Sequence, residues 1–398
     1  MGERCRMKTY REENKLIVAL EGKMDSVHAG ETEQEIREAI DAHPELQLCL
    51  DAEKLEYISS SGLRSLLKIQ KSLKTPMVIR NVNSEVYDIF TVTGFDTLLD
   101  VRKKRRSLSV EGCPVIGKGA FGTVYRLDGD TVVKVYKGGA EMLPMIESER
   151  DKAKQAFLQG IPTAIPFDVV EVGDQYGAVF EMIDARNCND LIVKDPGTLS
   201  EILPKYAEFL KEIHSQEAKG SLAVARDRYL GYLEKVRDAL EENTAARIAE
   251  TLRAMPEDRH LIHGDVHLKN VMVSDGRMTL IDMDMLCMGN PVFEFAGIFA
   301  PYIAFNEDDP KDSMRFMGIP RETAAHIMTE TLDLYLDHPG EEKKREVWEK
   351  IRLAGYLRFL YILTVEQRER TDPIKEIQIR HAAEHLKELA FRVNTLAM

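Results

Sequence analysis

The feature that most constrains the fold of this chain is a pair of polar motifs within residues 262–284. Asp265 is followed five residues later by Asn270, and Asp282 ends an apolar run twelve residues after Asn270. Phosphoryl transfer requires a carboxylate that orients the attacking hydroxyl and oxygen ligands that hold magnesium. The spacing therefore predicts a phosphoryl-transfer site, with Asp265 as the proton acceptor and with Asn270 and Asp282 as metal ligands. The alternative, an ordinary polar turn between two strands, is disfavoured by a second motif upstream.

The second motif is a glycine-rich segment that contains Ile116, Gly117, Gly119, Gly122 and Val124. A G-x-G-x-x-G pattern is weak evidence by itself, and in a dinucleotide-binding domain it would open a helix and precede an acidic residue about 20 positions later. Here apolar runs flank the glycines, which favours a hairpin. Glycines at the tip of a hairpin let backbone N–H groups approach the phosphates of a nucleotide closely.

Lys134 is the single charge in an alternating strand over residues 131–136. An isolated strand lysine would be interpreted as a surface residue, but its place after a glycine loop predicts contact with the nucleotide phosphates. Such a lysine is usually oriented by a carboxylate from the next helix. Residues 141–159 predict that helix, and Glu149 lies on its apolar stripe. Glu147 is the alternative, on another face, so we expect Glu149 to be the partner.

Together these motifs resemble those of the protein-kinase-like superfamily, and their exact sequences resemble those of its aminoglycoside/choline phosphotransferase branch. Eukaryotic-type protein kinases carry arginine where Gly264 stands and Phe-Gly after the metal-binding aspartate, whereas Met-Asp follows Asp282 here. A short Gly-x-Pro-x-x-Glu-x-Ala return, with Glu294 in the place of an aspartate, is similar to the small-molecule kinases. The resemblance covers residues 110–365. It implies a two-lobed fold, ATP and Mg²⁺ as cofactors, and transfer of the γ-phosphoryl group to a hydroxyl.

Composition limits the classes of protein to consider. The chain has 398 residues, of which 44% are apolar and 30% charged, as expected for a globular protein with two or three folding units. Its net charge of −13 argues against a nucleic-acid partner. No apolar run approaches the roughly 20 residues that span a bilayer, and the start lacks a secretory apolar core. Five dispersed cysteines predict neither disulfides nor a zinc site, so we expect a cytoplasmic protein.

A run of five basic residues at 102–106 cannot be buried and is interpreted as a solvated connector. A basic run can also attract anionic lipid or nucleic acid, but the acidic chain around it favours a linker. The predicted organisation is an α/β domain over 1–101, a linker over 102–109, a small β lobe over 110–185 and a helical lobe over 186–398. The helices expected in the last part are 199–215, 226–254, 321–336, 343–366 and 374–393.

Residues 1–101 alternate strand-like and helix-like segments, which predicts one small α/β domain. The run Ser59-Ser60-Ser61-Gly62, followed by an apolar helix, resembles the STAS (anti-sigma-factor-antagonist) domain. In that family the first serine of an Asp-Ser-Ser/Thr-Gly motif is a regulatory phosphoacceptor. This position falls on Ser60, although Ser59 replaces the usual aspartate. A serine in a strand-to-helix turn can also cap the helix. We expect that role for Ser61, and both interpretations stay open for Ser60.

Three functions are compatible with these motifs. The leading hypothesis is an ATP- and Mg²⁺-dependent phosphotransferase that acts on a hydroxyl of a small molecule, with the STAS-like domain as a regulatory unit that binds a protein partner. The second is a serine/threonine protein kinase of a partner-switch pathway, with Ser60 as a candidate substrate. The third is a non-catalytic regulator that only binds nucleotide. His214 and His267 are expected to be structural in each case.

Overall fold

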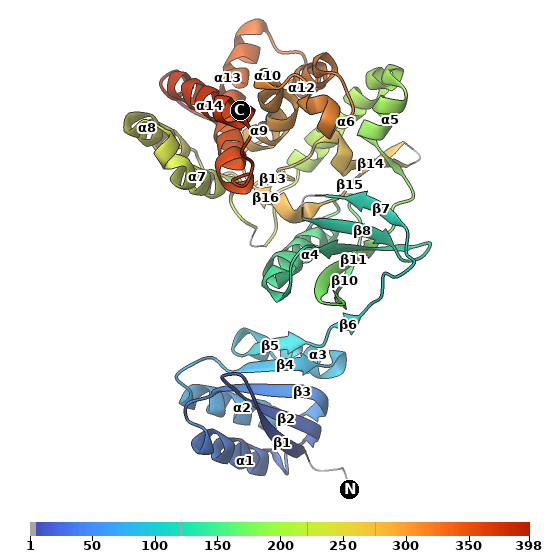
Figure 1. Cartoon of the computed structure of the whole chain (residues 1–398), viewed down its shortest axis with the longest axis vertical. Coiled ribbons are helices and arrows are strands. Elements are labelled where there is room, and N and C mark those ends of the chain that lie inside the picture. Colours follow the sequence, from blue (N-terminus) through green and yellow to red (C-terminus); the bar gives the residue numbers. More distant parts are fainter. Residues whose placement is uncertain (1–4, 120, 221, 275) are drawn as a thin grey trace. The chain divides into compact units, whose positions relative to one another are not determined.

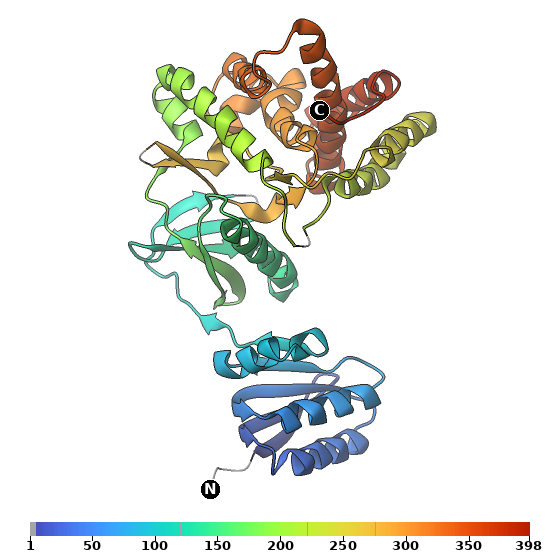
Figure 2. The same cartoon turned by 180° about the vertical axis from the view of Figure 1, so that it is seen from behind.

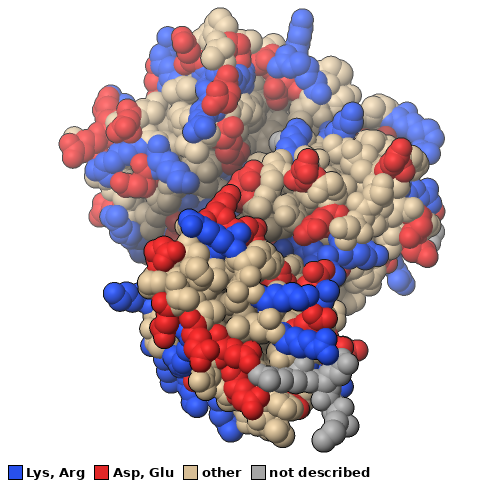
Figure 3. Space-filling view, turned by 60° about the horizontal axis from the view of Figure 1, so that its bottom comes forward, with Lys and Arg blue, Asp and Glu red and all other residues tan. Residues whose placement is uncertain are grey.

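The computed structural model describes residues 5–119, 121–220, 222–274 and 276–398. The chain divides into two compact units, Met1–Leu108 and Ser109–Met398. Figure 1 shows the first unit in blue to cyan and the second from teal to red. On the face shown in Figure 3, acidic and basic side chains are interspersed. Within the described residues, none of the helices combines the length and the apolar character needed to traverse a bilayer.

The N-terminal unit is a mixed α/β domain built on a five-stranded sheet in the order β1-β2-β3-β4-β5. β1 pairs antiparallel with β2, and the other neighbours are parallel. The helices α1 and α2 cover one face of the sheet (Figure 2), and apolar residues of β2, β3 and α2 fill the core between them. The bounds are β1 (Arg6–Glu12), β2 (Lys15–Met24), α1 (Ala29–Ala42), β3 (Gln47–Ile58), α2 (Ser60–Ser72), β4 (Val78–Val82), α3 (Ser84–Val92) and β5 (Asp100–Lys103).

Two features of this unit differ from the sequence-based expectation. β1 was not expected, because its side chains are almost all exposed and polar, so the strand carries no apolar alternation. It is held through backbone pairing with β2 over its whole length. The basic run is also not a plain connector, because β5 extends through Lys103 and pairs with β4. A second short strand, β6 (Arg106–Ser107), follows before the boundary between the units.

The second unit begins with a β lobe. Its strands lie side by side in the order β10-β11-β9-β8-β7, and the pairs are antiparallel. The helix α4 packs against β10 and β11 and places the buried Ile146 in an apolar cluster with Tyr136, Val169 and Ala178. The bounds are β7 (Val115–Lys118), β8 (Gly122–Arg126), β9 (Thr131–Tyr136), α4 (Leu143–Leu158), β10 (Pro166–Val172) and β11 (Gln175–Glu181). The hairpin expected around the glycine segment is therefore present.

The rest of the second unit is largely helical and surrounds a large apolar core. Short strands β12 (Arg186–Asn187), β14 (Val271–Ser274) and β15 (Arg277–Leu280) form one small sheet, and β13 (Leu261–Ile262) pairs with β16 (Cys287–Met288). The helices are α5 (Cys188–Lys194), α6 (Leu199–His214), α7 (Ala225–Val236), α8 (Glu242–Arg253), α9 (Val292–Phe299), α10 (Phe305–Asp308), α11 (Asp312–Phe316), α12 (Arg321–Tyr335), α13 (Glu341–Tyr361) and α14 (Pro373–Ala390).

One expected helix is wrong in its extent. The segment 226–254 forms two helices, α7 and α8, separated by a short 3-10 turn at Arg237–Ala239 and the extended residue Leu240. Neither glycine nor proline marks this break in the sequence. Its position is set by the packing of both helices onto the core, where Val236 and Ala245 are buried on either side of the turn.

Candidate functional site

Lys134 lies at the centre of an ion-pair network. It sits in β9 opposite Val124 of β8. Its Nζ donates to Glu149 Oε1 at 2.8 Å and Oε2 at 3.1 Å, and to Asp282 Oδ1 at 2.9 Å. Burial acts to lower the pKa of Lys134, but the Asp282 and Glu149 carboxylates outweigh it, so the pKa is raised. The side chain therefore stays cationic between its two acidic partners.

Glu149 reaches this lysine from the buried face of α4. Its side chain is only 3% exposed, and it shares that face with Ile146, Ala153 and Ala156. The hydroxyl of Tyr136 donates to Glu149 Oε2 at 2.7 Å, a contact that the sequence did not suggest. Thus Glu149, and not the alternative Glu147, is the carboxylate that meets Lys134.

Asp265 lies in the segment 263–270 between β13 and β14, here called the Asp265 loop. Arg358 Nη2 donates to Asp265 Oδ1 at 3.0 Å, and His267 Nε2 lies 3.7 Å from Oδ2. The backbone N–H of Asp265 donates to His263 Nδ1 at 3.2 Å. The amide of Asn270 donates through Nδ2 to the carbonyl of Asp265 at 2.9 Å, which turns the Asn270 amide oxygen away from that carbonyl.

The side chain of Glu294 binds the backbone at the start of the Asp265 loop. This residue of α9 is fully buried, and its two carboxylate oxygens accept from the N–H groups of His263 at 2.6 Å and Gly264 at 2.7 Å. His214 Nε2 lies 3.3 Å from Glu294 Oε2. Burial acts to raise the pKa of Glu294, but the hydrogen bonds from His214 and from the backbone N–H of His263 contribute to outweighing it, so the pKa is lowered. His214 thus contacts the buried carboxylate of Glu294, which in turn binds the backbone of the loop.

Asp282 stands at the end of β15 with a left-handed backbone, at φ 64° and ψ 71°. This conformation is uncommon for a residue other than glycine, and such residues concentrate at functional sites. Its neighbour Asp284 has a pKa raised to about 7 by burial and then by the charges of Asp282, Glu149 and Asp265. The site therefore gathers more negative charge than Lys134 alone balances.

The three glycines of the hairpin have different surroundings. A Cβ at Gly122 would lie 2.3 Å from the carbonyl oxygen of Val135, so the packing of β8 on β9 requires glycine there. A Cβ at Gly117 would meet nothing nearer than 3.6 Å, and at Gly119 nothing nearer than 4.0 Å. Ile116 is half exposed in β7. A Cβ at Gly117 or Gly119 would therefore make no more than an ordinary van der Waals contact with the described atoms, so the packing of the hairpin does not itself require glycine at these two positions.

The N-terminal unit holds the remaining predicted residue, Ser60. It is exposed and is the first residue of α2. The expectation that Ser61 caps this helix is wrong. Ser59 has an extended backbone, and its hydroxyl accepts from the N–H of Gly62 at 3.2 Å, so the cap falls two residues earlier and is buried.

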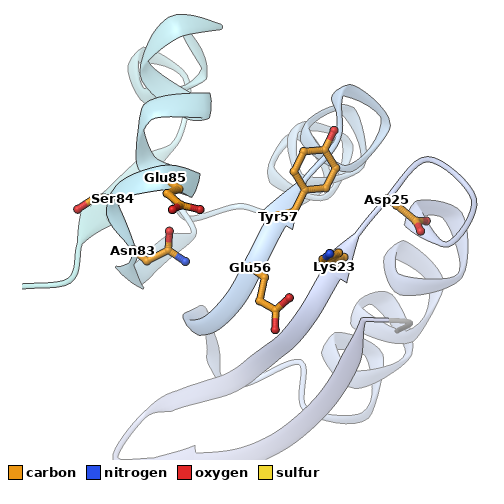
Figure 4. A pocket seen from close by; sticks show the side chains of 7 residues that line it. All are labelled: Lys23, Asp25, Glu56, Tyr57, Asn83, Ser84 and Glu85. Carbon is orange, nitrogen blue, oxygen red and sulfur yellow. The ribbon is translucent and has the colours of Figure 1, made fainter. Parts of the chain in front are cut away.

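An open hollow of about 900 Å³ lies at the ends of β2 and β3 and the start of α3 (Figure 4). Lys23 and Tyr57 are partners in the register of β2 and β3. Ser59 N donates to Met24 O at 3.0 Å, which places the first turn of α2 at this same edge of the sheet. The lining residues are Lys23, Asp25, Glu56, Tyr57, Asn83, Ser84 and Glu85.

Comparisons with known proteins identify families for both units. The model of the phosphotransferase enzyme family (APH) matches residues 113–316, and the model of the STAS domain matches residues 6–108. Over 95 residues the chain is 32% identical to BtrV of Bordetella bronchiseptica, which carries the provisional name of an anti-sigma factor antagonist. The match covers 23% of this chain and 81% of BtrV.

Two solved structures are similar to the second unit. The streptomycin–ATP–APH(2″)-IIa ternary complex is 16% identical, with 70% of this chain and 93% of that chain covered and a TM-score of 0.47. A choline/ethanolamine kinase family protein from Mesorhizobium loti is 16% identical, with 70% and 87% covered and a TM-score of 0.44. Because both TM-scores are below 0.5, neither likeness bears on substrate or nucleotide.

Proposed function

Since the chain belongs to the phosphotransferase enzyme family and carries an N-terminal STAS domain, we propose that it transfers the γ-phosphoryl group of ATP, with Mg²⁺, to a hydroxyl group of a small molecule. The observation that carries this proposal is the contact of Lys134 Nζ with both Glu149, at 2.8 Å, and Asp282, at 2.9 Å. It joins the sheet of the glycine hairpin to the turn that bears the acidic motif.

The nucleotide side of the proposal rests on the hairpin and on Lys134. Because Gly117 and Gly119 carry no side chains, the backbone of the hairpin could approach phosphate oxygens closely. Lys134 keeps its charge and is held by Glu149, as expected for a lysine that binds the α- and β-phosphates. Ile116 and Val124 flank the same hairpin and would contact the base.

The donor set fits Mg²⁺. Among the described residues no group of three or more His, Cys, Asp or Glu side chains is arranged to hold a metal ion. The proposed ligands are one amide oxygen, of Asn270, and one carboxylate, of Asp282, which leaves other positions to phosphates and water, as magnesium prefers. The pKa of Asp284 is raised first by burial and then by the neighbouring acidic charges, and a divalent cation would offset those charges. When bound, Mg²⁺ would neutralise charge on the β- and γ-phosphates.

Asp265 is the proposed proton acceptor. Its carboxylate orients the hydroxyl of the acceptor and takes up its proton as the new oxygen–phosphorus bond forms, while the bond from the γ-phosphorus to the β–γ bridging oxygen breaks and ADP leaves. A small acceptor is favoured because only a short segment, with the 3-10 turn at Met283–Met285 and β16, separates Asp282 from α9. This leaves no long segment on which a peptide substrate could dock.

The STAS domain is proposed to regulate the phosphotransferase unit through a protein partner. A second candidate function, phosphorylation of Ser60 by this chain or by another kinase, is favoured by the exposure of Ser60 at the edge that carries the hollow. A phosphate would add a charge of about −1.5 to −2 beside the acidic lining residues Asp25, Glu56 and Glu85. Such a change would alter the affinity of a partner for this edge.

The proposal is tested by phosphoryl transfer from labelled ATP with a panel of hydroxylated small molecules, followed by mass mapping of the protein. Asp282→Ala should weaken Mg²⁺-dependent ATP binding by about tenfold or more, which corresponds to about 1.4 kcal/mol. Binding without turnover in any condition would favour the non-catalytic regulator. A phosphate found on Ser60 would favour the kinase alternative. Equal turnover of the full chain and of a chain lacking residues 1–108 would argue against regulation by the STAS domain.

A further inference from the structure

Arg358 of α13 is a buried cation that reaches the Asp265 loop from a distant part of the chain. Its side chain is 10% exposed. Nη1 donates to the carbonyl of Gly264, and Nη2 donates to Asp265 Oδ1 at 3.0 Å. Burial acts to lower the pKa of Arg358, but the Asp265 carboxylate outweighs it and the pKa is raised. One guanidinium thus binds the backbone and the side chain of adjacent loop residues.

Two glycines allow α13 to come close enough for this contact. A Cβ at Gly355 would lie 2.4 Å from the ring of Phe299, so α13 and α9 pack against each other at this glycine. A Cβ at Gly297 would lie 2.7 Å from the carbonyl oxygen of Gly264 and 3.3 Å from Arg358 Nη1. A side chain at Gly355 would push α13 away from Phe299, and one at Gly297 would displace the loop or the arginine. The packing of α9 and α13 therefore leaves room for the Arg358 contact.

We propose that Arg358 is a positioning residue that holds one oxygen of Asp265 so that the other is presented to the acceptor hydroxyl. This inference rests on the proposed function of Asp265. A carboxylate bound through Oδ1 to a fixed guanidinium cannot rotate freely, and N–H groups of arginine match carboxylate geometry well. Oδ2 lies 3.7 Å from His267 Nε2, which is beyond hydrogen-bond distance. It is the oxygen left to meet a substrate.

The energetic argument separates this role from simple filling of the core. Burying a guanidinium costs free energy unless its charge is compensated. Asp265 supplies that compensation, so removal of Arg358 would leave a carboxylate without its partner and free to turn. A misplacement of about 1 Å in reacting groups can lower the rate by about 100-fold. Arg358 should therefore act on turnover and on the order of the loop, and not on nucleotide affinity.

The test compares Arg358→Met and Arg358→Lys in the full chain with the matched control Arg352→Met. Arg352 lies on the same helix and contacts His385, away from the Asp265 loop. Three quantities are measured: the affinity for Mg²⁺–ATP, the rate of Mg²⁺–ATP hydrolysis with water as acceptor, and hydrogen exchange in residues 263–270. Arg358→Met should lower the rate by about 10- to 100-fold, keep the affinity within about threefold and speed exchange in the loop. Arg358→Lys should recover part of the hydrolysis rate and should slow the exchange of the loop toward that of the wild type. Arg352→Met should change neither the rate nor the exchange.

Unchanged exchange of the loop in Arg358→Met would overturn the inference, and so would a loss of nucleotide affinity as large as the loss of rate. Gly297→Ala provides a second variant if Arg358→Met does not fold, and it should speed exchange in the same segment. If the wild-type chain neither hydrolyses ATP nor transfers its phosphate, the proposed function fails. The exchange comparison would still decide whether Arg358 orders the loop.

Discussion

The Asp265 loop and the turn at residues 59–62 both carry predicted functional residues, yet they are held in opposite ways. Buried side chains grip the Asp265 loop from two helices, with Glu294 on the backbone N–H groups and Arg358 on a carbonyl and a carboxylate. The turn at 59–62 is held by the cap of Ser59 and by backbone bonds at the end of β2, and Ser60 points to solvent.

The difference teaches what each segment is suited to do. A proton acceptor must sit within a fraction of an ångström of its target, and this requires supports whose own positions are fixed by packing. A serine that is modified, or that contacts a partner, needs access more than rigidity. The three predictions below test this contrast, starting with the largest expected effect.

Asp265→Asn should lower phosphoryl transfer by about 10²- to 10⁴-fold, because the amide cannot accept the proton of the attacking hydroxyl. Affinity for Mg²⁺–ATP should remain within about threefold, since Asp265 is not a proposed phosphate or metal contact. Steady-state kinetics and calorimetry measure the two quantities. Full turnover in this variant would mean that Asp265 is not the proton acceptor and that the Asp265 loop is held in place for another reason.

Glu294→Gln should destabilise the second unit by about 1.5–3 kcal/mol, because hydrogen bonds to a charged acceptor are lost at a fully buried site. Denaturation followed by the fluorescence of Trp348, the single tryptophan, measures this. The folded pKa of Glu294 lies below its ordinary value of 4.5. The stability that its charge contributes is therefore complete above pH 4.5 and is lost as the pH falls through the lower folded value.

The difference in the free energy of unfolding between the wild type and Glu294→Gln should thus be constant near neutral pH and should decrease on acidification. If this difference instead increased as the pH falls, the Glu294 carboxylate would be protonated in the folded chain. In that case the Asp265 loop would be held by neutral hydrogen bonds, and its contrast with the turn at 59–62 would weaken.

Ser59→Ala should destabilise α2 by about 1 kcal/mol through loss of the N-cap, whereas Ser60→Ala should stay within about 0.5 kcal/mol. Hydrogen exchange of the α2 amides in the full chain measures both changes. Equal destabilisation by the two variants would show that Ser60 is also a structural residue. The turn at 59–62 would then no longer contrast with the Asp265 loop.

Local patterns predicted much of this molecule. The families suggested for both units are confirmed by the comparisons, and so is the class of fold. The pairing of Glu149 with Lys134 followed from helical periodicity, because a carboxylate on an apolar stripe must face inward. The glycine hairpin followed from the apolar runs that flank it. In each case neighbouring residues in the sequence carried the information.

Contacts between distant segments were not predictable in this way. Arg358 is 93 positions from Asp265, and no motif connects them. A signal did exist, since Arg358 is the only charged residue between Leu353 and Val365, and a lone charge in an apolar helix needs a buried partner. The position of the cap at Ser59 was also missed. Three adjacent serines offer the same chemistry, and only the backbone path out of β3 selects one of them.

The place of Arg358 in the chain has a consequence for biosynthesis. Chains are made from the N-terminus onward, at about 5–20 residues per second, and domains generally fold as units. A nascent chain that has reached Asn270 and Asp282 already holds every residue proposed to bind nucleotide and metal. It still lacks α13 (Glu341–Tyr361), and with it the arginine bound to Asp265. Because a domain folds as a unit, Asp265 can take the orientation that Arg358 gives it only once α13 has left the ribosome.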